Sequence, residues 1–158
     1  MPYQSNQGSV GRSGSARRPN QASGPSLDTR NIVLKPGDGK SLSPALFDTV
    51  ARDTAKQLAG DDRNQKNKQS QVRQFYDELV MWEQRARQFP ERFDEFLPLI
   101  RMLNAKAAYA QGRGHVDANF VCLISHCLDQ VDGVDTLCNF KLFFEAFMGF
   151  YRLVGPKG

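Results

Sequence analysis

Residue types that carry chemistry in enzymes are scarce in this sequence. It contains two histidines, His115 and His126, and three cysteines. It has no G-x-S-x-G, H-E-x-x-H, phosphate-loop or dinucleotide-type glycine motif. Its acidic pairs, such as Asp94 and Glu95, lie in polar segments with no evident acid–base partner. No enzyme class is therefore supported, and the sequence predicts neither a catalytic residue nor a cofactor.

Half of a metal site is present where a cysteine precedes a histidine by four residues. Cys122 and His126 would share one side of a helix, whereas Cys127 would point about 100° away from His126. A structural zinc site takes four ligands, and this spacing supplies two. Packing explains these residues better than metal binding does, so no metal site is predicted.

The sequence also lacks the marks of secretion and of membrane insertion. Residues 1–10 contain no apolar segment like that of a signal peptide. No apolar run approaches the roughly 18 residues that a membrane-spanning helix needs. The odd number of cysteines has no disulfide-framework spacing. We therefore expect a cytoplasmic protein with reduced cysteines and no membrane contact.

The net charge of +4 is concentrated near the N-terminus. Residues 1–42 hold six basic and two acidic side chains, whereas residues 43–158 hold fifteen of each. Residues 1–42 are also rich in Gly, Ser, Gln and Arg, with too little apolar surface to offset the entropy of ordering. We expect a disordered basic tail over residues 1–42 and one folded domain over 43–158. Because this domain is neutral overall, it would have to bind a polyanion through one face.

Apolar side chains in the domain recur at helical spacing. Helices are expected at about 43–60, 70–88, 97–111, 118–130 and 135–153, with a short turn at 91–96. Ser70 and Asp117 are expected N-terminal caps, and Gly112 is an expected C-terminal cap. The last helix is apolar on more than one face, which is typical of a central helix. The predicted fold is all-α, a compact bundle of four to five helices.

The helix expected over 97–111 has an unusual outer face. On the side opposite Ile100, helical geometry places Met102, Lys106, Tyr109 and Arg113. Residues 97–116 contain no acidic side chain. An aromatic ring between cations suits the bases and phosphates of a nucleic acid. The alternative is that Tyr109 and Met102 pack against another helix while the cations extend into solvent, and spacing alone does not decide.

A second basic run precedes the helix expected at Ser70. It consists of Arg63, Lys66, Lys68 and Arg73, offset by Asp61 and Asp62. Free amides at the helix N-terminus and the positive end of its dipole would favour an anion there. The alternative is a solvated loop with a basic bias. Residues 112–115 (GRGH) also have two interpretations. Their glycines would suit either a nearby phosphate or a simple helix end.

Three segments, in this order, resemble a known family. Residues 70–75 (SQVRQF) at a helix start resemble one hallmark of the small subunit of type III-A CRISPR effector complexes, the Csm complexes. Residues 106–113 (KAAYAQGR) resemble the second hallmark. The aromatic-rich closing helix, from Phe140 to Tyr151 and followed by Arg152, resembles the third. The resemblance covers about residues 66–155 and assigns no role to the N-terminal tail.

The resemblance implies a non-catalytic helical subunit that stacks in several copies, head to tail, along a guide RNA for antiviral defence. It implies contact with other subunits, which carry out cleavage, and with the target RNA, mainly through the target-strand backbone. Carried onto this chain, the RNA contacts implied by the motifs are Gln71, Arg73, Lys106, Tyr109 and Arg113. Charge placement adds the candidates Lys66, Lys68, Arg101, Lys141 and Arg152.

A protein-interaction module is the alternative from another functional class. The neutral charge of the domain and the possible burial of Tyr109 would suit a helical adaptor with no direct RNA contact. RNA binding that is present at low salt and lost at moderate salt would separate the two hypotheses.

Overall fold

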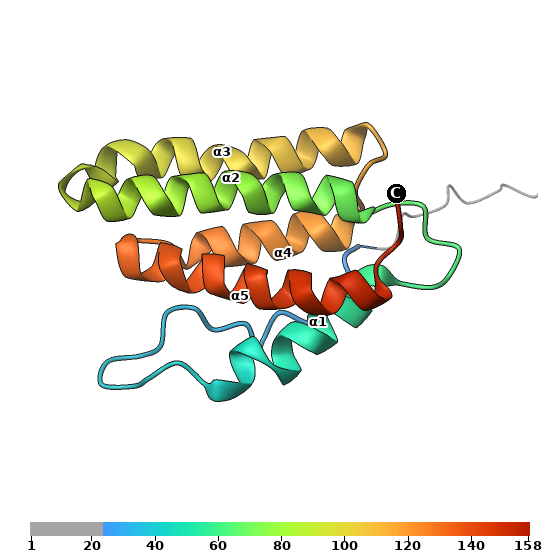
Figure 1. Cartoon of the computed structure of the whole chain (residues 1–158), viewed down its shortest axis with the longest axis horizontal. Helices are drawn as coiled ribbons and strands as arrows, with labels where there is room; N and C mark the ends of the chain where they lie inside the picture. The colour runs from blue at the N-terminus through green and yellow to red at the C-terminus, as the bar shows by residue number, and fades with distance from the viewer. Residues whose placement is uncertain (1–23) are drawn as a thin grey trace, which may run out of the picture.

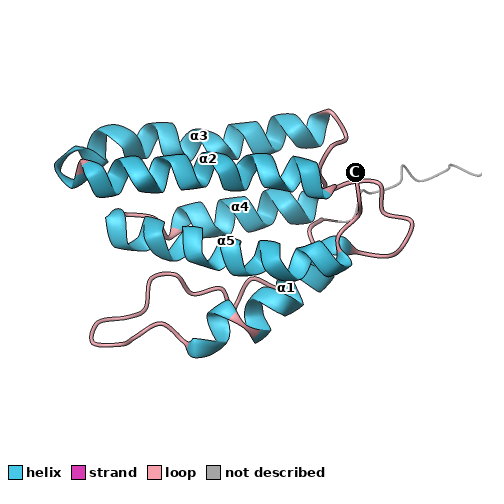
Figure 2. Cartoon of the chain, in the orientation of Figure 1, coloured by secondary structure: helices cyan, strands magenta, loops and turns pink. Residues whose placement is uncertain are grey.

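The computed structural model describes residues 24–158, which form helices and connecting loops without a strand (Figure 1, Figure 2). The elements are η1 (Pro44–Phe47), α1 (Thr49–Ala59), α2 (Gln69–Gln88), η2 (Pro90–Arg92), α3 (Phe93–Gly112), α4 (Ala118–Asp129) and α5 (Val134–Val154). The predicted all-α bundle is confirmed. Within the described range, no helix is long and apolar enough to cross a bilayer.

The central helix of the bundle is α5. It contacts α1 on one side and α2 on another, while α3 packs against α2 and α4 (Figure 1). Its fully buried aromatic side chains are Phe140, Phe143, Phe144, Phe147 and Tyr151. Burial of each such ring stabilises the fold by about 1.5–3 kcal/mol. The unusually broad apolar surface of this helix is therefore explained by neighbours on several sides.

One end of the bundle joins four segments that are far apart in the sequence, and Asn67 lies at their meeting point. Its backbone N–H donates to the His115 carbonyl (2.9 Å), and its side-chain amide donates to the Leu58 carbonyl (3.2 Å). Its Oδ1 accepts the Asp117 N–H (3.0 Å), and its own carbonyl accepts the Tyr151 hydroxyl (2.5 Å). The sequence predicts an exposed loop over residues 61–69, but Asn67 is 0% exposed.

The same junction explains two further properties of its residues. Asn67 has φ +58°, in the left-handed region, which asparagine tolerates better than most residues. Burial raises the pKa of Tyr151, because a phenolate would lose its hydration there. The hydroxyl of Tyr151 thus stays protonated and available to donate.

The structure differs from the sequence prediction over residues 24–42. Leu27, Ile32 and Leu34 are buried in the core of the domain, so this part of the expected tail belongs to the fold. Three apolar side chains are enough to anchor this polar segment. The average composition of residues 1–42 does not indicate them, because they are few. Residues 1–23 lie outside the described residues, so for them the disordered tail stays a prediction.

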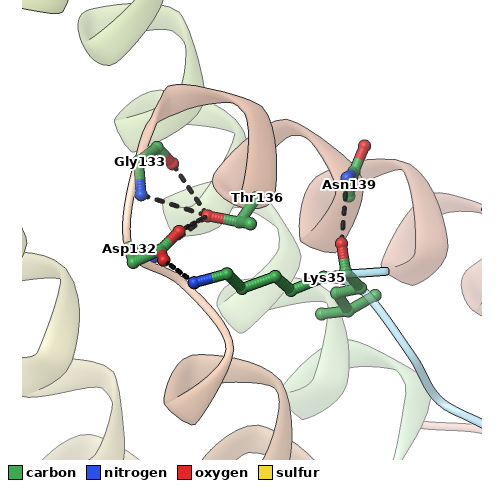
Figure 3. A network of polar contacts seen from close by, with 6 residues as sticks. Lys35, Asp132, Gly133, Thr136 and Asn139 are labelled. Atoms are coloured by element: carbon green, nitrogen blue, oxygen red, sulfur yellow. Dashed lines mark hydrogen bonds and ion pairs between the residues drawn. The ribbon is translucent and has the colours of Figure 1, made fainter. Parts of the chain in front are cut away.

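Polar contacts hold residues 34 and 35 against the start of α5 and the loop before it (Figure 3). Lys35 pairs with Asp132, which also lies within hydrogen-bond distance of the Thr136 hydroxyl (3.1 Å). The hydrogen bond from Lys35 lowers the pKa of the Asp132 carboxyl. Asn139 donates from its side chain to the Leu34 carbonyl (2.9 Å). The segment is therefore fixed by both apolar and polar contacts.

Some helix ends differ from those expected. α2 begins at Gln69 with Lys68 as its cap, so Ser70 is not the cap. α3 begins at Phe93, earlier than expected, and accommodates Pro98, whose missing amide leaves one carbonyl without its intrahelical partner. Gly112 is the last residue of α3 and not its C-terminal cap, which is Arg113. The glycine with a left-handed backbone conformation is Gly114 (φ +76°). The expected cap at Asp117 is confirmed, since its side chain accepts the Phe120 N–H.

Candidate nucleic-acid interface

Two grooves flank the N-terminal half of α2. The α2–α3 groove has a volume of about 540 Å³ and is lined chiefly by Gln71, Gln74, Glu78, Lys106, Tyr109 and His115. The α2–α5 groove has a volume of about 850 Å³ and is lined chiefly by Gln69, Ser70, Arg73, Met148, Arg152 and Lys157. Both lie toward the end of the bundle that contains the Asn67 junction.

The α2–α3 groove brings the two sequence motifs together. Gln71 comes from the first motif, and Lys106 and Tyr109 come from the second, on the neighbouring helix. Lys106 Nζ lies 2.5 Å from a carboxylate oxygen of Glu78, so α2 supplies the acidic side chain that residues 97–116 lack. The Lys106 side chain is nevertheless 49% exposed. The Glu78 side chain is less exposed, at 23%. Because solvent reaches half of the lysine, the pair is screened, and the lysine can exchange its partner for another anion.

Tyr109 faces the solvent, contrary to the packing alternative. It is 67% exposed, and Met102 is 51% exposed, so neither packs against another helix of the described chain. The Arg113 guanidinium lies 5.9 Å from the centre of the Tyr109 ring and donates to its hydroxyl oxygen (3.3 Å). An exposed ring with a cation against it can stack on a base while the cation meets a phosphate.

Arg73 lies on the other side of α2 from Gln71, because two helical residues turn the chain by about 200°. It pairs with Asp77 (2.9 Å), and its guanidinium lies 5.8 Å from the centre of the Tyr76 ring. Arg152 shares this α2–α5 groove and donates to the Gln69 side chain (3.1 Å). The first motif is therefore divided between two grooves.

The N-terminus of α2 does not offer free amides to an anion as expected. The backbone N–H of Gln69 donates to the Pro156 carbonyl (3.0 Å), and that of Ser70 donates to the Gly158 carbonyl (3.2 Å). Residues 156–158 thus occupy the position predicted for a phosphate. The sequence could not reveal this, because the contact joins residues more than eighty positions apart.

The remaining candidates are distributed unevenly. Lys66 and Lys68 flank Asn67 in the loop before α2, at the groove end of the bundle. Arg101 lies 4.0 Å from Asp129 at the far end of α4, and Lys141 pairs with Glu145 in the first half of α5 (3.5 Å). Neither Arg101 nor Lys141 lines either groove.

One residue of the suspected half metal site, His126, has another contact. His126 Nε2 lies 2.9 Å from the Ile32 carbonyl, and Cys127 is buried, which raises the pKa of its thiol. Among residues 24–158, no group of three or more His, Cys, Asp or Glu side chains could hold a metal ion.

Sequence reasoning missed three polar residues of the α2–α3 groove. Glu78 lies seven positions after Gln71, and Gln74 lies three positions after it, so both share its side of α2. This spacing could have identified them. His115 could not be placed in the same way, because it lies in the loop between α3 and α4.

Comparison with known proteins agrees with the motifs. A family model described as Csm2 Type III-A matches residues 42–157 of the chain. Comparisons with curated proteins and with solved structures found no match. The matched range contains both motifs and the α2–α3 groove, and it leaves out residues 24–41, of which Leu27, Ile32 and Leu34 are buried in the domain. The chain therefore belongs to the Csm2 Type III-A family, the small subunit of the type III-A CRISPR effector (Csm) complexes.

Proposed function

We propose that this subunit stacks head to tail in several copies along the guide RNA and stabilises the bound target RNA for antiviral defence, without a catalytic group of its own. The observation that carries this proposal is the α2–α3 groove, where Gln71, Lys106 and Tyr109 line one accessible surface. Separate motifs on two helices converge there, although residues 43–158 taken together have no net charge.

The contacts required of such a subunit are simple. Base pairing with the guide reads the target sequence, so the protein needs to contact only phosphates, sugars and exposed ring faces. In this proposal Lys106 and Arg113 bind phosphates and Tyr109 stacks on a base; the lining of the groove by Lys106 and Tyr109, with Arg113 against the Tyr109 ring, supports it. Gln71 and Gln74 line the same groove and can hydrogen-bond to sugar and phosphate oxygens.

Glu78 is proposed to act as an exchangeable counter-ion. It holds Lys106 in the groove in the absence of RNA, and a phosphate replaces it when RNA binds. Each copy then contributes a small number of contacts, and stacked copies multiply them along the strand.

The other candidates would extend the contact beyond this groove. Lys66 and Lys68 lie in the loop before α2, and Arg73 and Arg152 line the α2–α5 groove. Lys141 and Arg101 lie outside both grooves, so any RNA contact they make is separate from this one.

Replacing both Lys106 and Arg113 with alanine should weaken retention of target RNA by the assembled complex about tenfold or more. Each phosphate that the protein no longer neutralises lowers the steepness of log affinity against log salt by about 0.7 for a single strand and about 0.9 for a duplex. The steepness should therefore fall by roughly 1.4 to 1.8 in this variant. Titration of labelled target RNA at several salt concentrations measures both quantities.

Two controls accompany this variant. Replacing Arg101 and Lys141 with alanine removes the same charge outside the grooves and should have a smaller effect. Glu78→Gln removes the competing anion and should strengthen binding. Unchanged affinity and an unchanged salt slope for the Lys106 and Arg113 variant would contradict the proposed RNA contact.

A helical adaptor that binds protein only is the second candidate function. One observation favours it: Leu99 and Met102 are exposed on α3, close to half of each side chain. If serine at both positions releases the subunit from the complex, and charge removal at Lys106 and Arg113 leaves RNA binding intact, this candidate would replace the first.

A further inference from the structure

The two ends of the helical bundle carry charge of opposite sign. The turn end contains residues 88–95, around the link from α2 to α3, and residues 129–135, between α4 and α5 (Figure 1). These two segments hold six acidic residues and a single basic one. The groove end contains residues 60–68, 112–117 and 155–158, which hold five basic and three acidic residues. Each copy of the chain therefore presents a negative surface at one end and a positive surface at the other.

Part of the negative charge at the turn end has no counter-ion. Arg92 pairs with Glu95 (3.0 Å), and Lys35 pairs with Asp132. Three exposed acidic residues form no ion pair with any side chain of residues 24–158: Glu91, Asp94 and Asp135. The Phe89 ring, which is 37% exposed, lies in the same turn. The turn end thus combines accessible carboxylates with an accessible aromatic ring.

The α2–α5 groove, at the opposite end, has the complementary composition. Among the described residues its lining includes the cations Arg73, Arg152 and Lys157 and no acidic side chain. Arg73 pairs with Asp77, whereas Arg152 and Lys157 form no ion pair within the described part of the chain. Leu153 lines the same groove and is 83% exposed. This lining suits a protein segment with carboxylates and an apolar ring better than it suits RNA, because a phosphate makes no use of the leucine.

The rim of this groove is held in place by backbone contacts. The N–H of Gln69 donates to the Pro156 carbonyl (3.0 Å), and the N–H of Ser70 donates to the Gly158 carbonyl (3.2 Å). Lys157 lies between these two attachment points, so its backbone is fixed beside the start of α2. A surface that is already ordered loses less entropy when a partner binds.

The helix α2 connects the two surfaces. Ser70, in its first turn, lines the α2–α5 groove, and Phe89 directly follows its last residue. A helix of 20 residues is about 30 Å long, so the groove and the turn lie at opposite ends of the bundle. The turn of one copy can therefore meet the groove of the next when both copies point the same way along α2. A contact between two different surfaces does not close on itself, so it can repeat from copy to copy.

We infer that copies of this chain stack by placing the turn between α2 and α3 of one copy in the α2–α5 groove of the next. The carboxylates of Glu91 and Asp94 then face the groove cations. Phe89 packs against the exposed Leu153. This inference rests on the stacking included in the proposed function, and it names the two surfaces that meet. Turn-to-turn and groove-to-groove contacts are disfavoured, because each would bring like charges together.

Charge reversal on either surface tests this contact in the isolated full-length chain. Sedimentation at low salt should show wild-type oligomers larger than a dimer as the protein concentration rises. The turn variant is Glu91→Lys with Asp94→Lys, and the α2–α5 variant is Arg152→Glu with Lys157→Glu. Each should weaken self-association about tenfold or more, because like charges then face each other. A wild-type chain that stays monomeric at every concentration would overturn the inference.

An equimolar mixture of the two variants tests the pairing of the surfaces directly. The reversed turn of the first variant is complementary to the reversed groove of the second, and the unchanged turn of the second is complementary to the unchanged groove of the first. Mixing should therefore restore oligomers in which the two variants alternate. If the mixture stays as dissociated as each variant alone, the two surfaces do not pair and the inference is wrong. Restoration also shows that both variants are folded.

A matched control reverses the same amount of charge on the flank of the bundle. Arg52→Glu with Lys56→Glu lies on α1, outside both grooves, and should self-associate as the wild type does. A loss in this control equal to that in the α2–α5 variant would mean that net charge, and not a surface contact, controls the association.

The absence of RNA from these measurements separates this inference from the proposed RNA contact. If mixing fails while Lys106→Ala with Arg113→Ala still weakens retention of target RNA, the RNA contact stands and only this stacking surface is removed. If the α2–α5 variant keeps its self-association but lowers the RNA affinity of the assembled complex, that groove binds RNA and the inference is overturned.

Discussion

Replacement of Asn67 with alanine should destabilise the domain by about 3–7 kcal/mol. The side chain satisfies the Leu58 carbonyl and the Asp117 N–H, and each group left buried without a partner costs about 1–3 kcal/mol. Alanine in the left-handed backbone region adds about 1 kcal/mol. Small domains are stable by about 5–15 kcal/mol, so this single change removes a large share of the total.

Two further substitutions separate these contributions. Asn67→Gly loses both side-chain hydrogen bonds but tolerates the backbone angle, so it should be about 1 kcal/mol less destabilising than alanine. Gln65→Ala changes an exposed residue of the same loop and should lie within about 0.5 kcal/mol of the wild type. Urea unfolding followed by circular dichroism measures all three. A loss below about 1 kcal/mol for Asn67→Ala would show that this junction does not hold the helices together.

Replacement of Tyr109 with alanine should weaken target-RNA binding about 5- to 150-fold. Stacking of one base on an aromatic ring contributes about 1–3 kcal/mol, and the exposed Tyr109 ring with Arg113 beside it is suited to this contact. Because the side chain is mostly exposed, its removal should leave thermal stability almost unchanged. Dissociation of fluorescent target RNA from the assembled complex provides the measurement.

Tyr109→Phe is the matched control. It keeps the ring face and loses only the hydroxyl that accepts from Arg113, so its affinity should stay close to that of the wild type. If phenylalanine weakens RNA binding as much as alanine does, the hydroxyl rather than the ring face makes the contact. Equal binding by all three proteins would remove Tyr109 from the interface.

Much of the fold follows from local patterns in the sequence. The predicted bounds of α2, α4 and α5 are close to those observed, because the apolar spacing of these helices and the Asp117 cap are properties of neighbouring residues. Helical geometry likewise places Tyr109 on the side of its helix opposite Ile100, but whether that side packs on another helix or faces solvent is decided only by the structure.

Features that depend on distant contacts are not predictable in this way. From its composition, the segment of residues 24–35 is assigned to the disordered tail. Its burial is not predictable, because Leu27, Ile32 and Leu34 become buried only against helices that follow much later in the chain. Asn67 falls within a predicted solvated loop for the same reason. The division of Gln71 and Arg73 between two sides of α2 follows from helical geometry, but the neighbours that form each groove do not.

Ultraviolet cross-linking of the assembled complex to bound target RNA tests the central claim most directly. Mass spectrometry of the cross-linked peptides should find nucleotides attached to residues 102–115, with Tyr109 as the principal position, and to residues 69–78. Cross-links restricted to α1, or none from this subunit while its neighbours are cross-linked, would contradict the assignment of the α2–α3 groove as the RNA contact.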